Sequence, residues 1–154
     1  MAPRERFRGR EINYTRGKFF VDTNFLVYAY DSSAGKKWKT SSEILLLLWI
    51  HRTGVLSTQV IQELFVSLTQ KVKNPILPEM AKEIISDLLQ WPLVVNDGRN
   101  ILRAIDLQIK YHFSFWDSLI LQAAITSKSE FLLSEDFQDG QVIESVNIVN
   151  PFLE

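Results

Sequence analysis

Residues 19–31, Phe-Phe-Val-Asp-Thr-Asn-Phe-Leu-Val-Tyr-Ala-Tyr-Asp, decide the fold class of this chain. A short apolar strand at 18–21 stops at Asp22-Thr23-Asn24, and the apolar run resumes at Phe25. An acid between a strand and a helix lies where α/β proteins bind their ligands, outside the carboxyl ends of the strands. Asp22 is therefore the first candidate functional residue, and the structural alternative is an N-cap of the following helix.

Beyond this corner, short apolar strands alternate with longer helical segments. We predict strands at 18–21, 55–57, 92–95, 131–133 and 146–149. We predict helices at 24–30, 36–52, 58–73, 78–90, 97–111 and 115–127, with Gly54 closing the second of them. Strands separated by helices form parallel βαβ units whose sheet is covered on both faces. The sequence thus predicts an α/β fold, a three-layer α/β/α sandwich with a central parallel sheet of four to five strands.

The amino-acid composition excludes several kinds of functional site. A chain of 154 residues with 46% apolar and 23% charged content is typical of one globular domain. It has no cysteine, which excludes disulfides, zinc–thiolate sites and cysteine nucleophiles. The two histidines, His51 and His112, have no partner at metal-ligand spacing, so a metal would need oxygen ligands, as Mg²⁺ and Mn²⁺ do. The longest apolar run, Ile44–Ile50, is too short to span a bilayer, and no signal sequence is evident, so we expect a cytoplasmic protein with no membrane partner.

Residues 1–17 form a basic extension that precedes the predicted domain at 18–154. Residues 1–18 carry a net charge of +4, which leaves −5 for the remainder. One interpretation is a disordered, solvated tail, and another is an arm that adds affinity for phosphate. An organelle transit peptide is also Arg-rich, but Glu5 and Glu11 count against that interpretation.

Two further acids are hard to explain structurally. Asp136 follows the strand at 131–133, and in a sheet wound outward from its first strand this strand can neighbour the one before Asp22. Their ends would lie about 5 Å apart, where two carboxylates repel unless a cation or proton intervenes. Asp117 lies on a helix that is apolar nearly all round, where an unpaired buried carboxylate is costly. A first-turn acid favoured by the helix dipole is the alternative for Asp117.

Other residues are less distinctive. Glu63 lies roughly 140° from the centre of the apolar face of its helix, which by itself predicts a solvent-facing side chain. Glu135 and Asp139 compete with Asp136, and all three could belong to a polar turn. The four tryptophans stand in apolar runs and are predicted to be core residues: Trp38, Trp49, Trp91 and Trp116.

Four segments, taken in order, resemble a known family: FFVDTNFLVYAYD, LSTQVIQELF, FSFWDSLILQAA and LLSEDFQDGQ, from residue 19 to about 141. The chain resembles PIN-domain nucleases, and its small size resembles the VapC-type toxins of toxin–antitoxin systems. This resemblance implies a parallel sheet between helices and an acidic pocket that binds Mg²⁺ or Mn²⁺ and hydrolyses RNA. It assigns catalysis to Asp22, Glu63, Asp117 and Asp136, metal binding to Asp22, Asp117 and Asp136, and support to Asn24 and Ser134. Asp139 remains the competitor for the fourth place.

The resemblance also implies partners: an RNA substrate, a cognate antitoxin protein and a second copy of the chain. Two alternatives stay open. A non-catalytic PIN-like module could use the fold as a binding surface, although all four acids are present. A phosphatase of the haloacid-dehalogenase type also starts from an acid at a strand end, but it uses Asp-x-Asp, and Asn24 takes the third position here.

Overall fold

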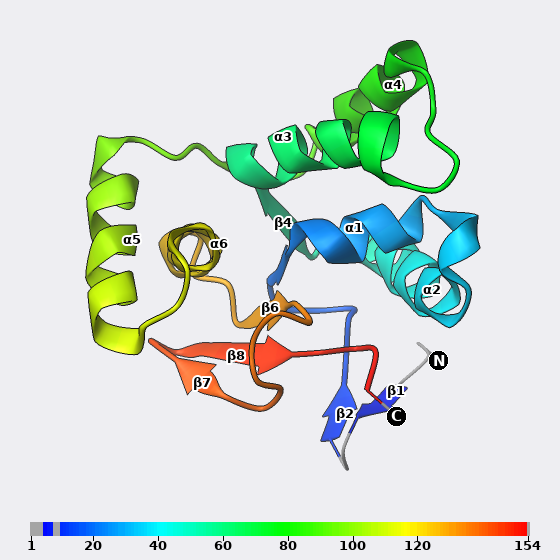
Figure 1. Ribbon diagram of the computed structural model, residues 1–154. Coiled ribbons are helices and arrows are strands. Elements are labelled where there is room, and N and C mark those ends of the chain that lie inside the picture. Colours follow the sequence, from blue (N-terminus) through cyan, green and yellow to red (C-terminus); the bar gives the residue numbers. More distant parts are fainter. Residues whose placement is uncertain (1–4, 8–9, 154) are drawn as a thin grey trace.

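The computed structural model describes residues 5–7 and 10–153, and its centre is a six-stranded sheet (Figure 1). The strands run across the sheet in the order β5-β4-β3-β6-β8-β7. Their bounds are β3 Phe19–Val21, β4 Gly54–Ser57, β5 Leu93–Val94, β6 Phe131–Leu133, β7 Val142–Ile143 and β8 Val146–Val149. The first five in that order are parallel, which confirms the predicted sheet of four to five parallel strands. The two-residue β7, which pairs antiparallel with β8, is too short to recognise from sequence.

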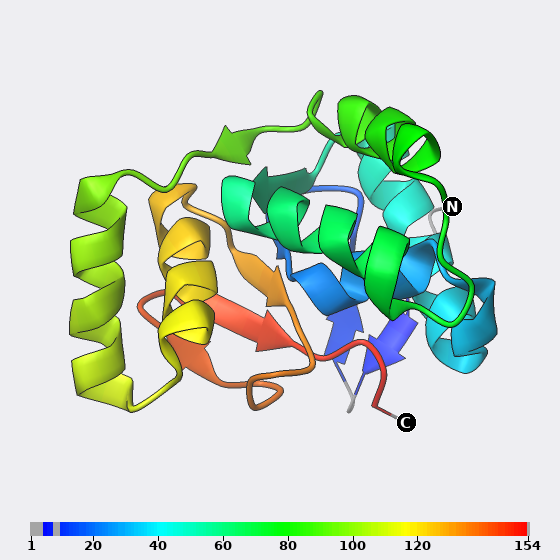
Figure 2. The ribbon, with the colours of Figure 1, turned by 45° about the horizontal axis from the view of Figure 1, so that its top comes forward.

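Helices cover both faces of the sheet, as the three-layer prediction requires. Their bounds are α1 Thr23–Ala29, α2 Lys36–His51, α3 Thr58–Val66, α4 Pro78–Leu88, α5 Gly98–Tyr111 and α6 Phe115–Thr126. Helices α5 and α6 pack together on one side, and α1 to α4 lie on the other (Figures 1 and 2). In the part of the chain that the structure describes, no helix is long and apolar enough to cross a membrane.

Strand β3 is the central strand, and it sets the position of the polar residues that follow it. Its three side chains are fully buried, as a strand covered on both faces requires. It pairs in parallel with both β4 and β6, and Val21 stands opposite Leu133. The prediction that the first strand neighbours the strand at 131–133 is confirmed. The residues after Val21 and Leu133 therefore meet at the same edge of the sheet.

Two details of the predicted helices differ from the structure. The helix expected at 58–73 is α-helical only to Val66 and continues as a π-helical turn, η2, over Ser67–Lys71. Helix α2 ends through Arg52, which is left-handed (φ 55°), so the prediction that Gly54 closes it was wrong. Gly54 lies in β4, where a Cβ atom would stand 2.1 Å from the Trp91 ring. Glycine is needed there for the close approach of that ring.

The segment before β3 contains a short β-ribbon. Strands β1 (Glu5–Phe7) and β2 (Arg10–Ile12) form a separate antiparallel pair. Ile12 and Tyr14 are buried and belong to the same core as β3. The predicted basic extension therefore ends in core residues, while 1–4 and 8–9 lie outside the described residues.

The tryptophans do not share one environment. Trp91 is buried and meets the half-buried Trp49 edge to face, with ring centroids 5.2 Å apart, as expected of core residues. Trp38 is 41% exposed and Trp116 is 62% exposed. The core prediction was thus wrong for Trp38 and Trp116, because neighbours in sequence do not reveal which face of a helix is covered.

Candidate active site

The four predicted acids come from four different elements around the carboxyl ends of β3 and β6. Asp22 follows β3 and is the N-cap of α1, while Asp136 follows β6 after a two-residue turn. Glu63 lies on α3, and Asp117 lies in the first turn of α6. This edge is where a parallel α/β sheet places its ligands.

Asp22 is held more firmly than the other acids. It is 5% exposed, and its two carboxylate oxygens accept different hydrogen bonds. Oδ1 accepts from the Thr23 amide at 2.7 Å, and Oδ2 accepts from the Ser134 hydroxyl at 2.6 Å. Ser134 Oγ also accepts from the Asp136 amide at 3.1 Å. The buried Ser134 therefore links the first acid to the fourth through the register of β3 and β6.

Burial raises the pKa of Asp22 to about 7. The hydrogen bonds from Ser134 and Thr23 lower the pKa, and the charges of Asp136 and Asp117 raise it again. The carboxyl thus holds its proton close to neutral pH, because it is removed from water and faces other negative charges. A cation bound beside Asp22 would instead favour the ionised carboxylate and lower its pKa.

Asp117 and Asp136 belong to the same electrostatic cluster. Partial burial raises the pKa of both carboxyls. For Asp117 the Ser114 hydrogen bond lowers the pKa, and the charge of Glu63 raises it. For Asp136 the charge of Asp117 adds to the rise, while a side-chain hydrogen bond with Asp22 opposes it. Asp22, Asp117 and Asp136 therefore each experience the charge of neighbouring acids, Glu63 among them.

Glu63 is half-buried and is turned toward this cluster. Its Oε2 accepts from the Thr23 hydroxyl at 2.8 Å, and its Oε1 accepts from Gln59 Nε2 at 2.8 Å. Since Thr23 directly follows Asp22, this hydrogen bond connects α3 to the first acid. The periodicity of α3 did not predict the contact with Thr23, because Thr23 lies on another helix.

Two further predicted residues, Asn24 and Asp139, lie outside the acid cluster. Asn24 is exposed and lines a cavity beside Glu63. Asp139 accepts a hydrogen bond from the Asn150 amide at 2.9 Å and lines a different hollow, together with Glu11. Of the two competitors for the fourth place, Asp136 lies with the acids, and Asp139 fastens the loop to the end of β8.

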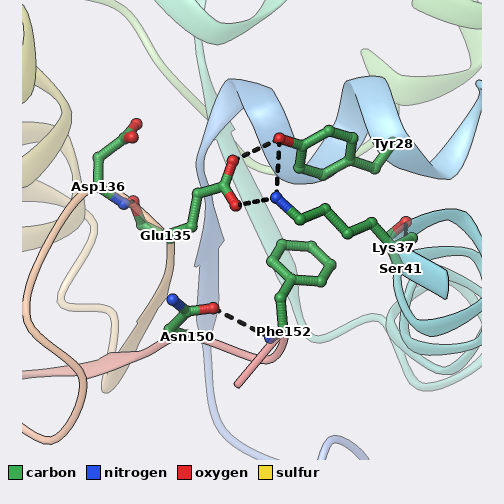
Figure 3. A network of polar contacts seen from close by, with 8 residues as sticks. Tyr28, Lys37, Ser41, Glu135, Asp136, Asn150 and Phe152 are labelled. Atoms are coloured by element: carbon green, nitrogen blue, oxygen red, sulfur yellow. Dashed lines mark hydrogen bonds and ion pairs between the residues drawn. The ribbon is translucent and has the colours of Figure 1, made fainter. Parts of the chain in front are cut away.

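A network that sequence reasoning missed holds the turn that carries Asp136 (Figure 3). The hydroxyl of Tyr28, on α1, donates to Glu135, and Lys37 Nζ, on α2, lies 2.8 Å from the other oxygen of the same carboxylate. The ammonium also lies over the Tyr28 ring, 4.8 Å from its centroid, and the Phe152 ring meets Tyr28 edge to face. The turn is thus fastened to two helices one residue before Asp136. Only the acidic run at 135–136 hinted at this role, and nothing in the sequence indicated Lys37.

The donor set of this cluster is of the kind that a hard divalent cation prefers, although the described side chains do not form a preformed site. Within residues 5–7 and 10–153, no three His, Asp or Glu side chains are arranged as a preformed metal site. The acids nevertheless offer several carboxylate oxygens, which Mg²⁺ and Mn²⁺ prefer. Since burial and neighbouring charges raise the pKa of Asp22 and Asp136, a cation would displace protons from these carboxyls and reduce the repulsion between them. The residues therefore fit such an ion by charge and ligand type.

The chain is thus an α/β sandwich protein with a cluster of acids at the carboxyl ends of its parallel strands. The PIN domain family model matches residues 19–138, and the chain belongs to the PIN domain family. No curated protein sequence matches the chain.

Solved structures share this fold at low sequence identity. A toxin–antitoxin complex from Klebsiella pneumoniae has a TM-score of 0.64 and 18% identity, with 88% of this chain and 98% of that chain covered. VapBC2 from Rickettsia felis, bound to a DNA fragment from its promoter, has a TM-score of 0.59 and 18% identity over 84% and 96%. VapC20 from Mycobacterium tuberculosis, a toxin that cleaves the sarcin–ricin loop, has a TM-score of 0.57 and 13% identity over 75% and 87%. At these identities the likeness concerns the fold.

Proposed function

We propose that this chain is a divalent-metal-dependent endoribonuclease and the toxin of a type II toxin–antitoxin pair. The observation that carries the proposal is the convergence of Asp22, Glu63, Asp117 and Asp136 in a PIN fold. Three of them, Asp22, Asp117 and Asp136, would hold Mg²⁺ or Mn²⁺. When bound, the ion would supply an activated water and neutralise charge on the phosphoryl oxygens.

The protein's own groups supply position and charge. The Thr23 amide and the Ser134 hydroxyl fix both oxygens of Asp22, so its carboxylate cannot rotate freely. Gln59 and Thr23 orient Glu63 in the same way. Without a cation the cluster repels phosphate, so RNA affinity must come from basic and aromatic groups around it. Single-stranded RNA is the expected substrate, because its flexible backbone can enter a recessed site.

Cleavage assays test this proposal directly. Single-stranded RNA would be incubated with the purified protein in Mg²⁺, Mn²⁺ or EDTA, and with Asp22→Asn and Asp117→Asn variants whose fold is checked by circular dichroism. We expect each substitution to lower the rate by at least about 100-fold. Water as the nucleophile leaves 5′-phosphate and 3′-hydroxyl ends. Cleavage that survives EDTA or both substitutions, or 2′,3′-cyclic phosphate ends, would reject a metal-dependent nuclease.

The same assay separates the alternatives. A non-catalytic binding module would bind RNA without cutting it. A phosphatase would release phosphate from small phosphomonoesters, and Asn24 in place of the second acid of Asp-x-Asp already disfavours it. For the antitoxin, the expected result is that expression of this chain arrests growth and that co-expression of a small protein encoded beside it relieves the arrest.

A homodimer is part of the proposal. Helix α5 carries four exposed apolar side chains along one stripe: Ile101 at 40%, Leu102 at 66%, Ile105 at 38% and Ile109 at 69%. Contiguous apolar surface of this kind marks protein interfaces, and a second copy would cover it. We expect light scattering to give the dimer mass at micromolar concentration and Leu102→Lys to give the monomer. A monomer for the unmodified chain would refute the dimer.

A further inference from the structure

Trp116 is an exposed aromatic side chain at the edge of the acid cluster. It stands one residue before Asp117 in the first turn of α6, and 62% of its surface is exposed. Phe115 packs against it at a ring angle of 69°, with centroids 5.2 Å apart, which limits its orientation. An indole exposed to this extent adds little to the core, and such side chains are enriched where a partner covers them.

Trp116 borders an open cavity of about 550 Å³. This volume lies within the usual range of small-molecule sites, about 300–1,000 Å³. The cavity borders the acid cluster through Glu63 and through Thr23, whose hydroxyl donates to Glu63. Its remaining lining is mostly polar: Asn24, Gln59, Gln62, Ser67 and Lys71, with Val66.

Two features of the wall fix the shape and the charge of the cavity, a held amide and a π-helical turn. Gln59 is 5% exposed, and its Nε2 donates to Glu63 Oε1 at 2.8 Å and to the Trp116 carbonyl at 3.3 Å. Both partners are acceptors, which fixes the orientation of the amide. Gln59 Oε1 is then a buried acceptor with no donor among the described residues. This oxygen is closed off from solvent, so Gln59 forms a fixed part of the wall, and ligand contacts are left to the exposed side chains of Asn24 and Gln62.

The second feature is the π-helical turn η2. Such turns are rare and occur frequently at functional sites. Here the first and last residues of the turn, Ser67 and Lys71, both line the cavity. The turn therefore brings the Lys71 side chain to a cavity whose lining includes one acid, Glu63. A cation beside an acidic cluster suits a ligand that carries phosphate.

We propose that this cavity binds a nucleotide of single-stranded RNA next to the scissile phosphate. Trp116 stacks on the base, the amides of Asn24 and Gln62 hydrogen-bond to its edge, and Lys71 contacts a phosphate. Amides both donate and accept, so the cavity accommodates more than one base. The inference rests on the proposed nuclease function and adds to it a nucleobase subsite outside the acid cluster.

The test measures RNA binding without cleavage. A fluorescein-labelled, 12-nucleotide single-stranded RNA is titrated in Mg²⁺ against Asp22→Asn, and against that variant carrying Trp116→Ala, Trp116→Phe or Trp38→Ala. Trp38 is the matched control, because it is an exposed tryptophan outside the cavity. Anisotropy should show about tenfold weaker binding for Trp116→Ala, with Trp116→Phe within about threefold and Trp38→Ala unchanged. Lys71→Met should reduce the slope of log affinity against log salt by about 0.7.

A second readout separates stacking from a structural role. RNA should quench tryptophan emission in the Asp22→Asn protein, and Trp116→Phe should abolish most of that quenching while retaining affinity. An abasic oligomer of the same length should bind Trp116→Ala and its parent equally. Binding of Trp116→Ala within twofold of its parent, or equal weakening for the abasic oligomer, would overturn the proposal. If the wild-type protein binds RNA through Trp116 but does not cut it, the nuclease proposal is wrong and the nucleobase subsite stands.

Discussion

Replacing Asp22 by asparagine should stabilise the metal-free protein, and the gain should grow with pH. Burial and neighbouring charges raise the pKa of Asp22 to about 7 in the folded state, whereas an unfolded chain has a value of about 3.9. Between about pH 4 and pH 7 the folded protein keeps this proton and the unfolded chain has lost it. The folded state binds more protons in this window, so its stability falls as pH rises through it.

The two pKa values set the size of the effect. Since each pH unit between them corresponds to about 1.4 kcal/mol, Asp22 costs the fold on the order of 4 kcal/mol at pH 8 and roughly 1–2 kcal/mol at pH 5. Asparagine has no such charge. Its Oδ1 can keep the bond from the Thr23 amide, while the Ser134 hydroxyl loses the carboxyl oxygen that accepts from it. Relative to the protonated carboxyl this loss is about 0.5–1.5 kcal/mol, and it does not depend on pH because the difference between the two pKa values already includes the effect of ionisation. The stability of Asp22→Asn relative to wild type should therefore rise by about 2–3 kcal/mol from pH 5 to pH 8.

Urea unfolding in EDTA at both pH values measures this difference. Asp97→Asn is the matched control, because Asp97 caps α5 by accepting from the Asn100 amide at an exposed helix end. It should change stability by a few tenths of a kcal/mol at most, since asparagine caps helices as well as aspartate. Adding Mn²⁺ should stabilise wild type and leave Asp22→Asn unchanged. A difference between mutant and wild type that is independent of pH would refute the electrostatic reasoning and make Asp22 a structural hydrogen-bond partner.

Three further predictions concern the surroundings of the acids. Lys37→Met should loosen the turn before Asp136 and lower the cleavage rate constant roughly tenfold at saturating RNA. Lys110→Met is the control, because it removes an ion pair with Glu144 and should leave the cleavage rate constant unchanged. Calorimetry should show that Asp136→Asn weakens Mn²⁺ binding and that Asp139→Asn changes it little; the reverse would move the fourth ligand along the loop. Glutamine at the four arginines of residues 1–10 should flatten the salt dependence of RNA binding and leave saturating turnover intact. If the salt dependence of RNA binding is unchanged, these arginines do not contact phosphate.

Most of the sheet and the helices could be predicted because their signals are local. Buried parallel strands such as Phe19–Val21 are continuous apolar runs, and caps such as Ser114 and Asp97 mark where helices begin. The π-helical turn at Ser67–Lys71 could not be predicted, because its residues continue the helical pattern of α3. The left-handed end of α2 at Arg52 was missed because Gly54 gives a stronger sequence signal, yet Gly54 is required by the packing of Trp91.

Only part of the candidate site could be predicted from the sequence. Asp22 and Asp136 follow from strand order, which places the ends of β3 and β6 side by side. The contact of Glu63 with Thr23 depends on how α3 packs beside α1, and the period of one helix does not contain that information. Lys37 reaches the site from α2 across 98 residues of sequence, so only the tertiary structure shows that it holds Glu135.

The arrangement of these contacts explains how a small domain can keep repelling carboxylates together. One pair, Asp22 and Asp136, is joined through Ser134 and the register of β3 and β6. The other acids enter from helices, and the Thr23 hydroxyl ties Glu63 to the residue next to Asp22. Each tie donates a hydrogen bond to a carboxylate, which offsets part of the cost of burying it. What remains uncompensated in the metal-free protein is the burial of the Asp22 carboxyl, which is the main cause of its raised pKa, with a smaller contribution from the charges of Asp136 and Asp117. A bound cation would favour the ionised carboxylates and offset part of this cost, so the feature that destabilises the fold would also favour metal binding.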